Sequence, residues 1–232
     1  MNGTSFKETS LALLTLLLLG LTILGSAFLV TLLVSPLLLA HPTHFYGLTW
    51  HQQLREYGRI IHFLLSATPR LTFRWLPLAP AGQHHFQEVR MLVRGGLLLT
   101  VSAGVGSGWL LRRASRTYQL WRLPSLLRWL LPWLGTLAGL LILNFGTGFW
   151  RFHELIFANR DWVFTPKKEP IIRLLTSGFF WRYFVVWVML TSLGLWASLR
   201  RLEHQLVRFL RAAQPGLDAT DDRGNQGDDD DR

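Results

Sequence analysis

The sequence predicts an all-α integral membrane protein with four transmembrane helices and a small extracytoplasmic cap of short helices, with or without short strands. Half of its 232 residues are apolar and only 16% are charged, against about 25% in soluble domains. The charges are also unevenly spread, because four long runs contain no Asp, Glu, Lys or Arg: residues 9–54, 95–111, 129–150 and 183–199. Since about 20 apolar helical residues cross a bilayer, these runs exclude a soluble globular protein.

The first run is long enough to stay in the membrane as a helix. The apolar stretch from Ser10 to Ala40 is about twice as long as the core of a signal peptide, and it ends in a poor cleavage sequence. We therefore expect a retained helix that ends near Pro36, followed by spans at about 91–111, 126–145 and 178–199. Four spans put both termini on one side. The short basic connection 112–128 contains no acid, which favours the cytoplasm for its side and for the termini.

The cap is expected from the two longer connections, which are residues 41–90 and 148–177. Thr49 and Gln52 have the spacing of a capping box, and apolar residues then recur every three or four positions from Trp50 to Leu64. This pattern predicts an amphipathic helix on or near the membrane surface. The alternation over residues 71–75 predicts a short strand, and residues 169–175 predict one more short helix.

Charge divides the chain into a basic body and an acidic tail. The net charge is +10, but residues 218–232 carry −5 and the first 217 residues carry +15. The basic residues mostly flank the apolar runs, where they meet lipid phosphates, so we expect membrane lipids and not nucleic acid as partners. We predict a membrane domain over residues 1–212 and a disordered acidic tail over residues 213–232. The absence of cysteine excludes disulfides, thiolate metal sites and a cysteine nucleophile.

Most of the histidines fall in or beside the outer connections. An imidazole with an apolar body and a polar tip suits a membrane interface, and that is the interpretation for His41, His44, His51 and His62. His85 and Glu88 share a helical face just before the second span, and His153 follows the third span. If the topology is right, His85 and His153 can meet, and two imidazoles suit proton transfer near neutral pH. No histidine combines with a carboxylate at metal-ligand spacing, so we predict no metal and no cofactor.

Two segments contain a more specific pattern. The first reads HFQEVR over residues 85–90. The second reads NFGTGFWRFHELIFANRDWVFTP over residues 144–166 and continues as IIRLLTSGFF over residues 171–180. Both resemble the bacterial lipoprotein intramolecular transacylases, whose pattern has H-x-x-D-V-K and then D-F-D-x-x-F-x-x-F-H-x-x-x-F-x-N-x-x-W-x-x-D-P. The spacing is kept without a gap across the longer motif. Neutral residues replace acids of that pattern at Asn144, Gly146 and Thr165.

The resemblance implies an enzyme of the bacterial cell membrane that acts on diacylated lipoproteins. Such an enzyme moves the sn-2 acyl chain of the diacylglyceryl cysteine to the α-amino group of the same cysteine. The product is a lyso-form lipoprotein. The active site would face the extracytoplasmic interface, and the reaction requires no cofactor.

The resemblance also implies roles for individual residues. His153 takes the proton of the amine, while His85 polarises the ester carbonyl or returns the proton; the reverse assignment stays open. Glu88 fixes the tautomer of one imidazole. Asn159 either donates to the oxyanion or caps a turn, and Arg90 holds a phosphate or a backbone carbonyl. The supporting residues are thus Glu88, Arg90, Asn159 and Asn144.

Two alternatives remain at this point, of which the first belongs to another class. One is a non-catalytic membrane protein whose histidine-rich outer face senses pH or binds a metal. The other is an acyltransferase that takes its acyl chain from a separate donor molecule. The lack of cysteine disfavours this second alternative, because no acyl-cysteine intermediate can form.

Overall fold

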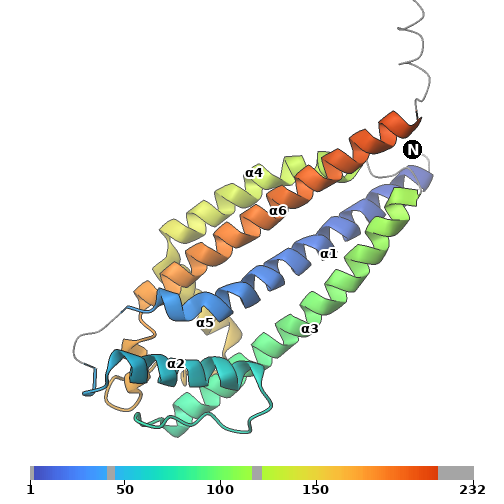
Figure 1. Ribbon diagram of the computed structural model, residues 1–232. Coiled ribbons are helices and arrows are strands. Elements are labelled where there is room, and N and C mark those ends of the chain that lie inside the picture. The colour runs from blue at the N-terminus through green and yellow to red at the C-terminus, as the bar shows by residue number, and fades with distance from the viewer. Residues whose placement is uncertain (1–2, 41–44, 117–121, 214–232) are drawn as a thin grey trace, which may run out of the picture.

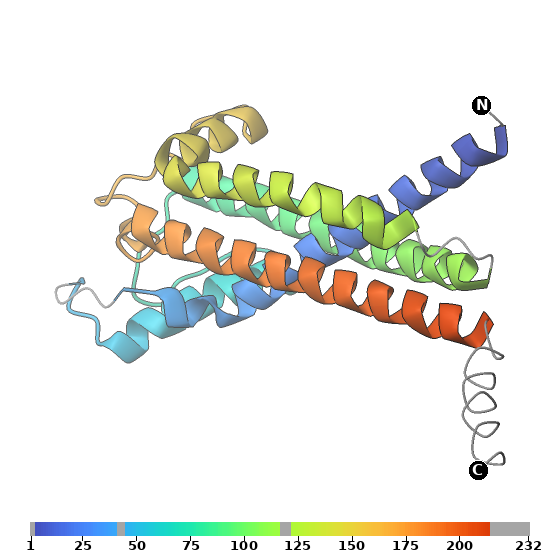
Figure 2. The same ribbon diagram turned by 90° about the horizontal axis from the view of Figure 1, so that it is seen from above.

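The computed structural model describes residues 3–40, 45–116 and 122–213, and over these residues its secondary structure is entirely helical. Four helices are long and apolar enough to cross a membrane, which confirms the predicted fold class. They are α1 (Gly3–Val34), α3 (Pro80–Arg116), α4 (Arg122–Leu143) and α6 (Ser177–Ala213). They run lengthwise side by side, with the start of α1 and the end of α6 at the same end (Figures 1 and 2). The predicted tail beyond Ala213, as well as His41 and His44, lies outside the described residues.

Several helix ends lie close to the expected positions, but α3 starts earlier than expected and α6 extends to Ala213, well beyond the expected end near residue 199. Helix α1 ends just before Pro36, which lies in the 3₁₀ turn η1 (Ser35–Leu38), because proline cannot donate to the helical ladder. Close contact between α1 and α3 depends on Gly25, where an added Cβ would lie 1.7 Å from Thr100 Oγ1. Helix α3 starts well before residue 91, the predicted start of the span. Its first turns therefore carry the predicted site residues 85–90.

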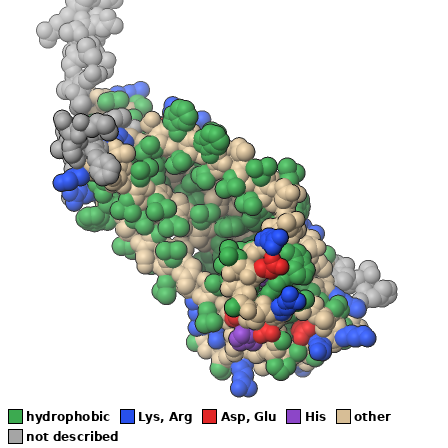
Figure 3. Space-filling model, turned by 180° about the vertical axis from the view of Figure 1, so that it is seen from behind, with side chains coloured by type: hydrophobic (Ala, Val, Ile, Leu, Met, Phe, Trp, Pro, Cys, Tyr) green, Lys and Arg blue, Asp and Glu red, His purple; other side chains and the backbone are tan. Residues whose placement is uncertain are grey.

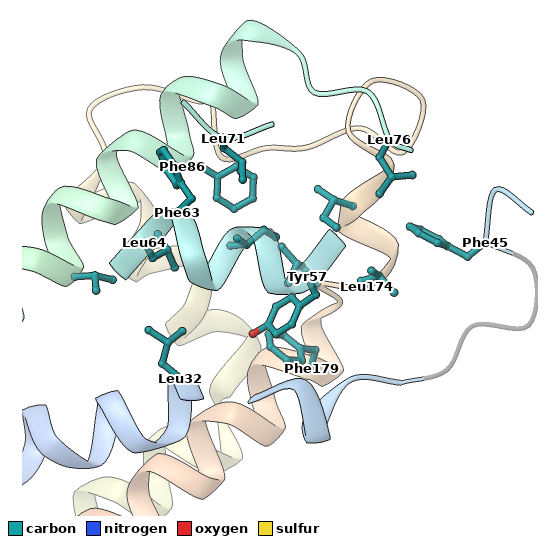
Figure 4. Packing of buried hydrophobic residues seen from close by; sticks show 14 residues of the cluster. Leu32, Phe45, Tyr57, Phe63, Leu64, Leu71, Leu76, Phe86, Leu174 and Phe179 are labelled. Carbon is teal, nitrogen blue, oxygen red and sulfur yellow. The ribbon is translucent and has the colours of Figure 1, made fainter. Parts of the chain in front are cut away.

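The amphipathic helix of the cap is confirmed as α2 (Trp50–Leu65). Thr49 N–H donates to Gln52 Oε1 over 2.8 Å, and Gln52 N–H donates to Thr49 Oγ1 over 3.4 Å, which completes the capping box. The apolar face of α2 is buried at the end of the bundle, where Tyr57 packs against Phe179 of α6 (Figure 4). Tyr57 also hydrogen-bonds to Ser35 at the end of α1, with 2.6 Å between the two oxygens. These contacts fix α2 across the ends of α1 and α6.

The strand predicted over residues 71–75 does not form, and that prediction was wrong. The backbone groups are paired with side chains instead of with a second strand. The N–H groups of Arg74 and Trp75 donate to the carboxylate of Glu56 over 2.9 and 3.2 Å. The amide of Gln83, in the orientation that satisfies both partners, binds the C=O and the N–H of Leu71 at 2.8 and 3.1 Å.

The segment after α4 differs most from the expectation. Instead of one span reaching residue 145 and then a connection, α4 ends at Leu143 and a separate helix, α5 (Phe145–Ile156), follows. The break occurs at Asn144, whose φ of −107° and ψ of 26° are not helical. Helix α5 then turns back beside the end of α4 (Figure 2). A 3₁₀ turn, η2 (Pro170–Arg173), lies where the further short helix was predicted and leads into α6.

The buried residues form one cluster at each end of the bundle. The larger cluster joins α2 to the ends of α1, α3 and α6 (Figure 4). The smaller one, at the opposite end, consists of Ala12, Leu16, Ala114, Leu123, Leu127, Leu199 and Leu202. Between the ends, large apolar side chains face outward, and on the face in Figure 3 the Lys and Arg side chains lie toward both ends while the Asp, Glu and His side chains gather at one end. This is the distribution expected of helices whose middle sections face lipid.

Candidate active site

His85 and His153 come together at the end of the bundle that carries α2. His85 lies on the second turn of α3 and is 8% exposed. His153 lies near the end of α5 and is half-buried. Because α5 turns back after Asn144, it places His153 beside α3, and the centroids of the two imidazole rings are 6.1 Å apart. The geometry thus brings together the two histidines that the sequence selected.

Aromatic side chains surround both imidazoles. The ring of Phe157 lies 4.8 Å from that of His85 and 5.5 Å from that of His153. The ring of Trp162 lies 5.0 Å from that of His153, and the ring of Phe164 lies 5.6 Å from that of His85. These rings cover part of each imidazole, and charge interactions in such apolar surroundings are stronger than in bulk solvent.

The tautomer of His153 follows from its own helix. Its Nδ1 lies 2.7 Å from the backbone oxygen of Phe149, one turn earlier in α5. A carbonyl oxygen only accepts hydrogen bonds, so Nδ1 carries the proton and Nε2 keeps its lone pair. Burial of the ring lowers the pKa of His153 below its usual value of 6.5, and the hydrogen bond to Phe149 offsets part of this effect. His153 is therefore neutral at pH 7, with Nε2 available as a proton acceptor.

Glu88 and Asn159 extend the site on the side of His85. Glu88 Oε2 lies 3.9 Å from His85 Nδ1, and both atoms are buried without a hydrogen-bond partner among the described residues. The amide of Asn159 donates to Glu88 Oε1 over 2.8 Å. The side-chain oxygen of Asn159 accepts from the N–H of Asp161 over 2.9 Å, which is an Asx turn. Of the two predicted roles for Asn159, these contacts match the capping of a turn.

Arg90 and Asn144, the other predicted supporting residues, lie in different surroundings. The guanidinium of Arg90 donates to the backbone oxygen of Thr68 and lies 4.2 Å from the ring centroid of Phe63. It therefore fixes the loop after α2, which is the second of the two roles expected for it. Asn144 is exposed at the junction of α4 and α5, where its side chain donates to the backbone oxygen of Leu140 over 3.0 Å.

From the sequence alone the Phe149 carbonyl was missed, and Trp162, which belongs to the motif and was expected to pack, was not placed against His153. The Phe149 carbonyl that orients His153 is four residues earlier in the chain, so the spacing would have revealed it if α5 had been predicted as a helix. The indole of Trp162, which packs on His153, depends on the fold of the turn that follows α5. Over the described ranges, no group of three or more His, Asp or Glu residues could hold a metal ion. The arrangement can move protons between two imidazoles inside an apolar enclosure.

Comparison with known proteins identifies the family. A model of the family described as lipoprotein intramolecular transacylase Lit matches residues 9–180, well over half of the chain. The chain belongs to the Lit family. It is therefore a multi-pass membrane acyltransferase, a lipoprotein intramolecular transacylase, and the alternative of a non-catalytic sensor or metal-binding protein is not favoured.

Solved structures of a Lit protein share the fold. The in meso structure of the transacylase Lit from Bacillus cereus is 20% identical in sequence and has a TM-score of 0.74, over 90% of this chain and 99% of that chain. A variant of the same protein, in which one histidine is replaced by arginine, is 21% identical over 91% of this chain and 96% of that one, with a TM-score of 0.68. A search of curated proteins finds no match.

Proposed function

We propose that this Lit-family protein moves the sn-2 acyl chain of a diacylglyceryl-cysteine lipoprotein to the α-amino group of the same cysteine, giving the lyso form. The observation that carries the proposal is the contact between His85 and His153 within an aromatic enclosure. The nucleophile and the ester belong to one molecule, so the protein gains much of the rate by holding them together. Such positioning accounts for about 7–11 kcal/mol of a barrier in favourable cases.

The reaction consumes no proton overall. An amide bond forms between the amine nitrogen and the acyl carbon, and the ester bond between that carbon and the glycerol oxygen breaks. One proton leaves the amine, and one proton arrives on the glycerol oxygen. The site therefore needs a proton acceptor and a proton donor, and two neighbouring imidazoles can serve as both.

In this proposal His153 is the base and His85 is the proton donor. Nε2 of His153 accepts the amine proton, because Nδ1 is already committed to the Phe149 carbonyl. His85 returns a proton to the leaving glycerol oxygen. The proton that His153 has gained then passes to His85, which returns the pair to its starting state. Glu88, with Oε2 3.9 Å from His85 Nδ1, favours the protonated form of His85, which burial of the ring disfavours. Asn159 orients the carboxylate through its bond to Glu88 Oε1.

The proposed placement in the membrane puts both termini in the cytoplasm and the α2 end, with the histidine pair, at the extracytoplasmic interface. The substrate is a lipoprotein anchored by its acyl chains, so the site has to open toward lipid. Helix α5 supports a site that opens toward lipid, because its apolar side chains Phe152 and Leu155 are exposed, Leu155 by 83%. Apolar side chains so exposed beside a buried histidine fit a lipid boundary. Lipids, and not nucleic acid, are the neighbours expected there.

The test uses the purified protein and a synthetic diacylated lipopeptide, with the product identified by mass spectrometry. His85→Ala and His153→Ala are each expected to lower kcat by at least about 100-fold, since general acid–base groups contribute that much or more. His62→Ala is the matched control, because His62 is an exposed histidine of α2 whose side chain contacts Ser66. If the wild-type protein leaves the lipopeptide unchanged, the proposed function is wrong. If both histidine variants convert it as fast as the wild type, the assigned roles are wrong.

A further inference from the structure

Two polar bridges join the first turns of α3 to the turn that follows α5. One is the bond from Asn159 to Glu88. The other links His84 Nδ1 to Asp161 Oδ2 across 2.7 Å. His84 and Glu88 are four residues apart on α3 and so share one face. Asn159 and Asp161 are joined in turn by the bond from the Asp161 N–H to Asn159 Oδ1, 2.9 Å long. The two bridges therefore run side by side and connect the same two segments.

The turn held by these bridges, residues 157–164, supplies the aromatic wall of the site. The indole of Trp162 donates to the backbone oxygen of Asn159 over 3.0 Å, and its ring packs on His153. At the start of the turn, Phe157 contacts both imidazoles. A displacement of the turn would thus move both rings away from the histidines and separate Asn159 from Glu88.

We propose that His84 and Asp161 are positioning residues that hold the 157–164 turn against α3, so that His85 and His153 keep their relative geometry; this rests on the proposed function. His84 has a side chain that is 54% exposed and is bound to Asp161. An exposed pair of this kind adds little to the stability of the fold. Its effect comes through the bonded chain from Asp161 to Asn159 and on to Glu88. A displacement of about 1 Å in a catalytic site can cost about 100-fold in rate, so a modest shift of the turn suffices.

Replacement of His84 by the amide residues Asn and Gln tests this positioning role with two closely matched variants. In His84→Asn the amide nitrogen occupies nearly the position of Nδ1, whereas in His84→Gln it occupies nearly that of Nε2. We expect His84→Ala to lower kcat about tenfold with a smaller change in KM, His84→Asn to restore most of the loss, and His84→Gln to restore little. Asp161→Asn keeps an acceptor oxygen and is expected to resemble the wild type more than Asp161→Ala does.

A double-mutant cycle then tests whether His84 and Asp161 affect kcat through their contact with each other. Because both residues act through one contact, the double Ala variant is expected to be no slower than the slower single variant. Glu154→Ala is the control, since it breaks an exposed ion pair with Arg151 on α5, 3.1 Å long, outside the two bridges. Full additivity of the two Ala effects on kcat, or equal rescue by Asn and Gln at position 84, would overturn the proposal.

Hydrogen–deuterium exchange gives a measurement that does not depend on turnover. In His84→Ala the amides of residues 157–164 are expected to exchange about tenfold faster, while those of α2 keep the wild-type rate and the thermal midpoint is unchanged. An active wild type with unchanged exchange and unchanged kcat in His84→Ala contradicts the positioning role. An inactive wild type with faster exchange in the variant contradicts the proposed function and supports the bridge.

Discussion

At the scale of the residue, the Phe149 carbonyl determines what His153 can do. Because the ring is partly buried, its charged form is disfavoured and its pKa lies below 6.5. His153 therefore stays neutral until the pH falls through that lowered value, and the proposed base is lost only below it. We predict that ¹⁵N NMR of the imidazoles, assigned by comparison with His153→Ala, shows the Nδ1–H tautomer for His153 at pH 7. A proton on Nε2, or protonation of the ring at pH 6.5 or above, would contradict this prediction.

The histidines of the site could be predicted from the sequence, but their polar partners could not. The spacing of the motif selected His85 and His153, and the topology of four spans placed them at one end. The contact from Asn159 to Glu88 joins residues that are far apart in the chain. It exists because the turn after α5 docks on α3, and no local pattern specifies that docking. The same holds for Asp161, which has no motif of its own and gains a partner only in the folded protein.

At the scale of the element, the loop between α2 and α3 depends on one buried carboxylate. Glu56 is fully buried and accepts the backbone N–H groups of Arg74 and Trp75. Glu56→Ala leaves both donors unpaired, so we predict a loss of about 2–3 kcal/mol in the free energy of unfolding, with Glu56→Gln losing less. Thermal unfolding in detergent measures the change. Arg59→Ala is the control, because the Arg59 side chain is 42% exposed and its Nε lies 3.8 Å from Glu56 Oε1. A loss in Arg59→Ala as large as in Glu56→Ala would contradict the assignment.

The elements that were predicted correctly are those whose signals are local. Helix α2 follows from a capping box and a periodic apolar face, both of which are contained within its own residues. Helix α5 was missed because the break at Asn144 lies inside the charge-free run 129–150, where hydropathy does not distinguish one helix from two. The prediction of a strand over residues 71–75 was wrong for a different reason. Its alternation was real, but side chains from α2 and α3 paired its backbone groups.

At the scale of the whole molecule, the absence of cysteine makes the proposed orientation directly measurable. A single cysteine introduced at Arg70, an exposed residue at the α2 end, should react with a membrane-impermeant maleimide in intact spheroplasts. One introduced at Arg208, exposed near the far end of α6, should react only after the cells are broken. This pattern is expected because the basic connection between α3 and α4 favours the cytoplasm. Labelling of the Arg208→Cys variant in intact spheroplasts, with protection of Arg70→Cys, would reverse the orientation.

The whole molecule also predicts that acyl chains are not exchanged between substrate molecules. The ring and charge contacts of the histidine pair are made by aromatic residues and Glu88, and the sequence has no cysteine that could hold the acyl chain as a thioester. An acyl chain is therefore expected to pass directly from the glycerol to the amine of the same lipopeptide. The measurement mixes two lipopeptides. One of them carries both a deuterated sn-2 chain and a heavier peptide, and the other carries neither. Mass spectrometry should then find each label only on its own peptide. A statistical mixture of labels and peptides would instead require transfer between molecules, either directly from one lipopeptide to another or through an acyl group held on the protein, and would contradict this prediction.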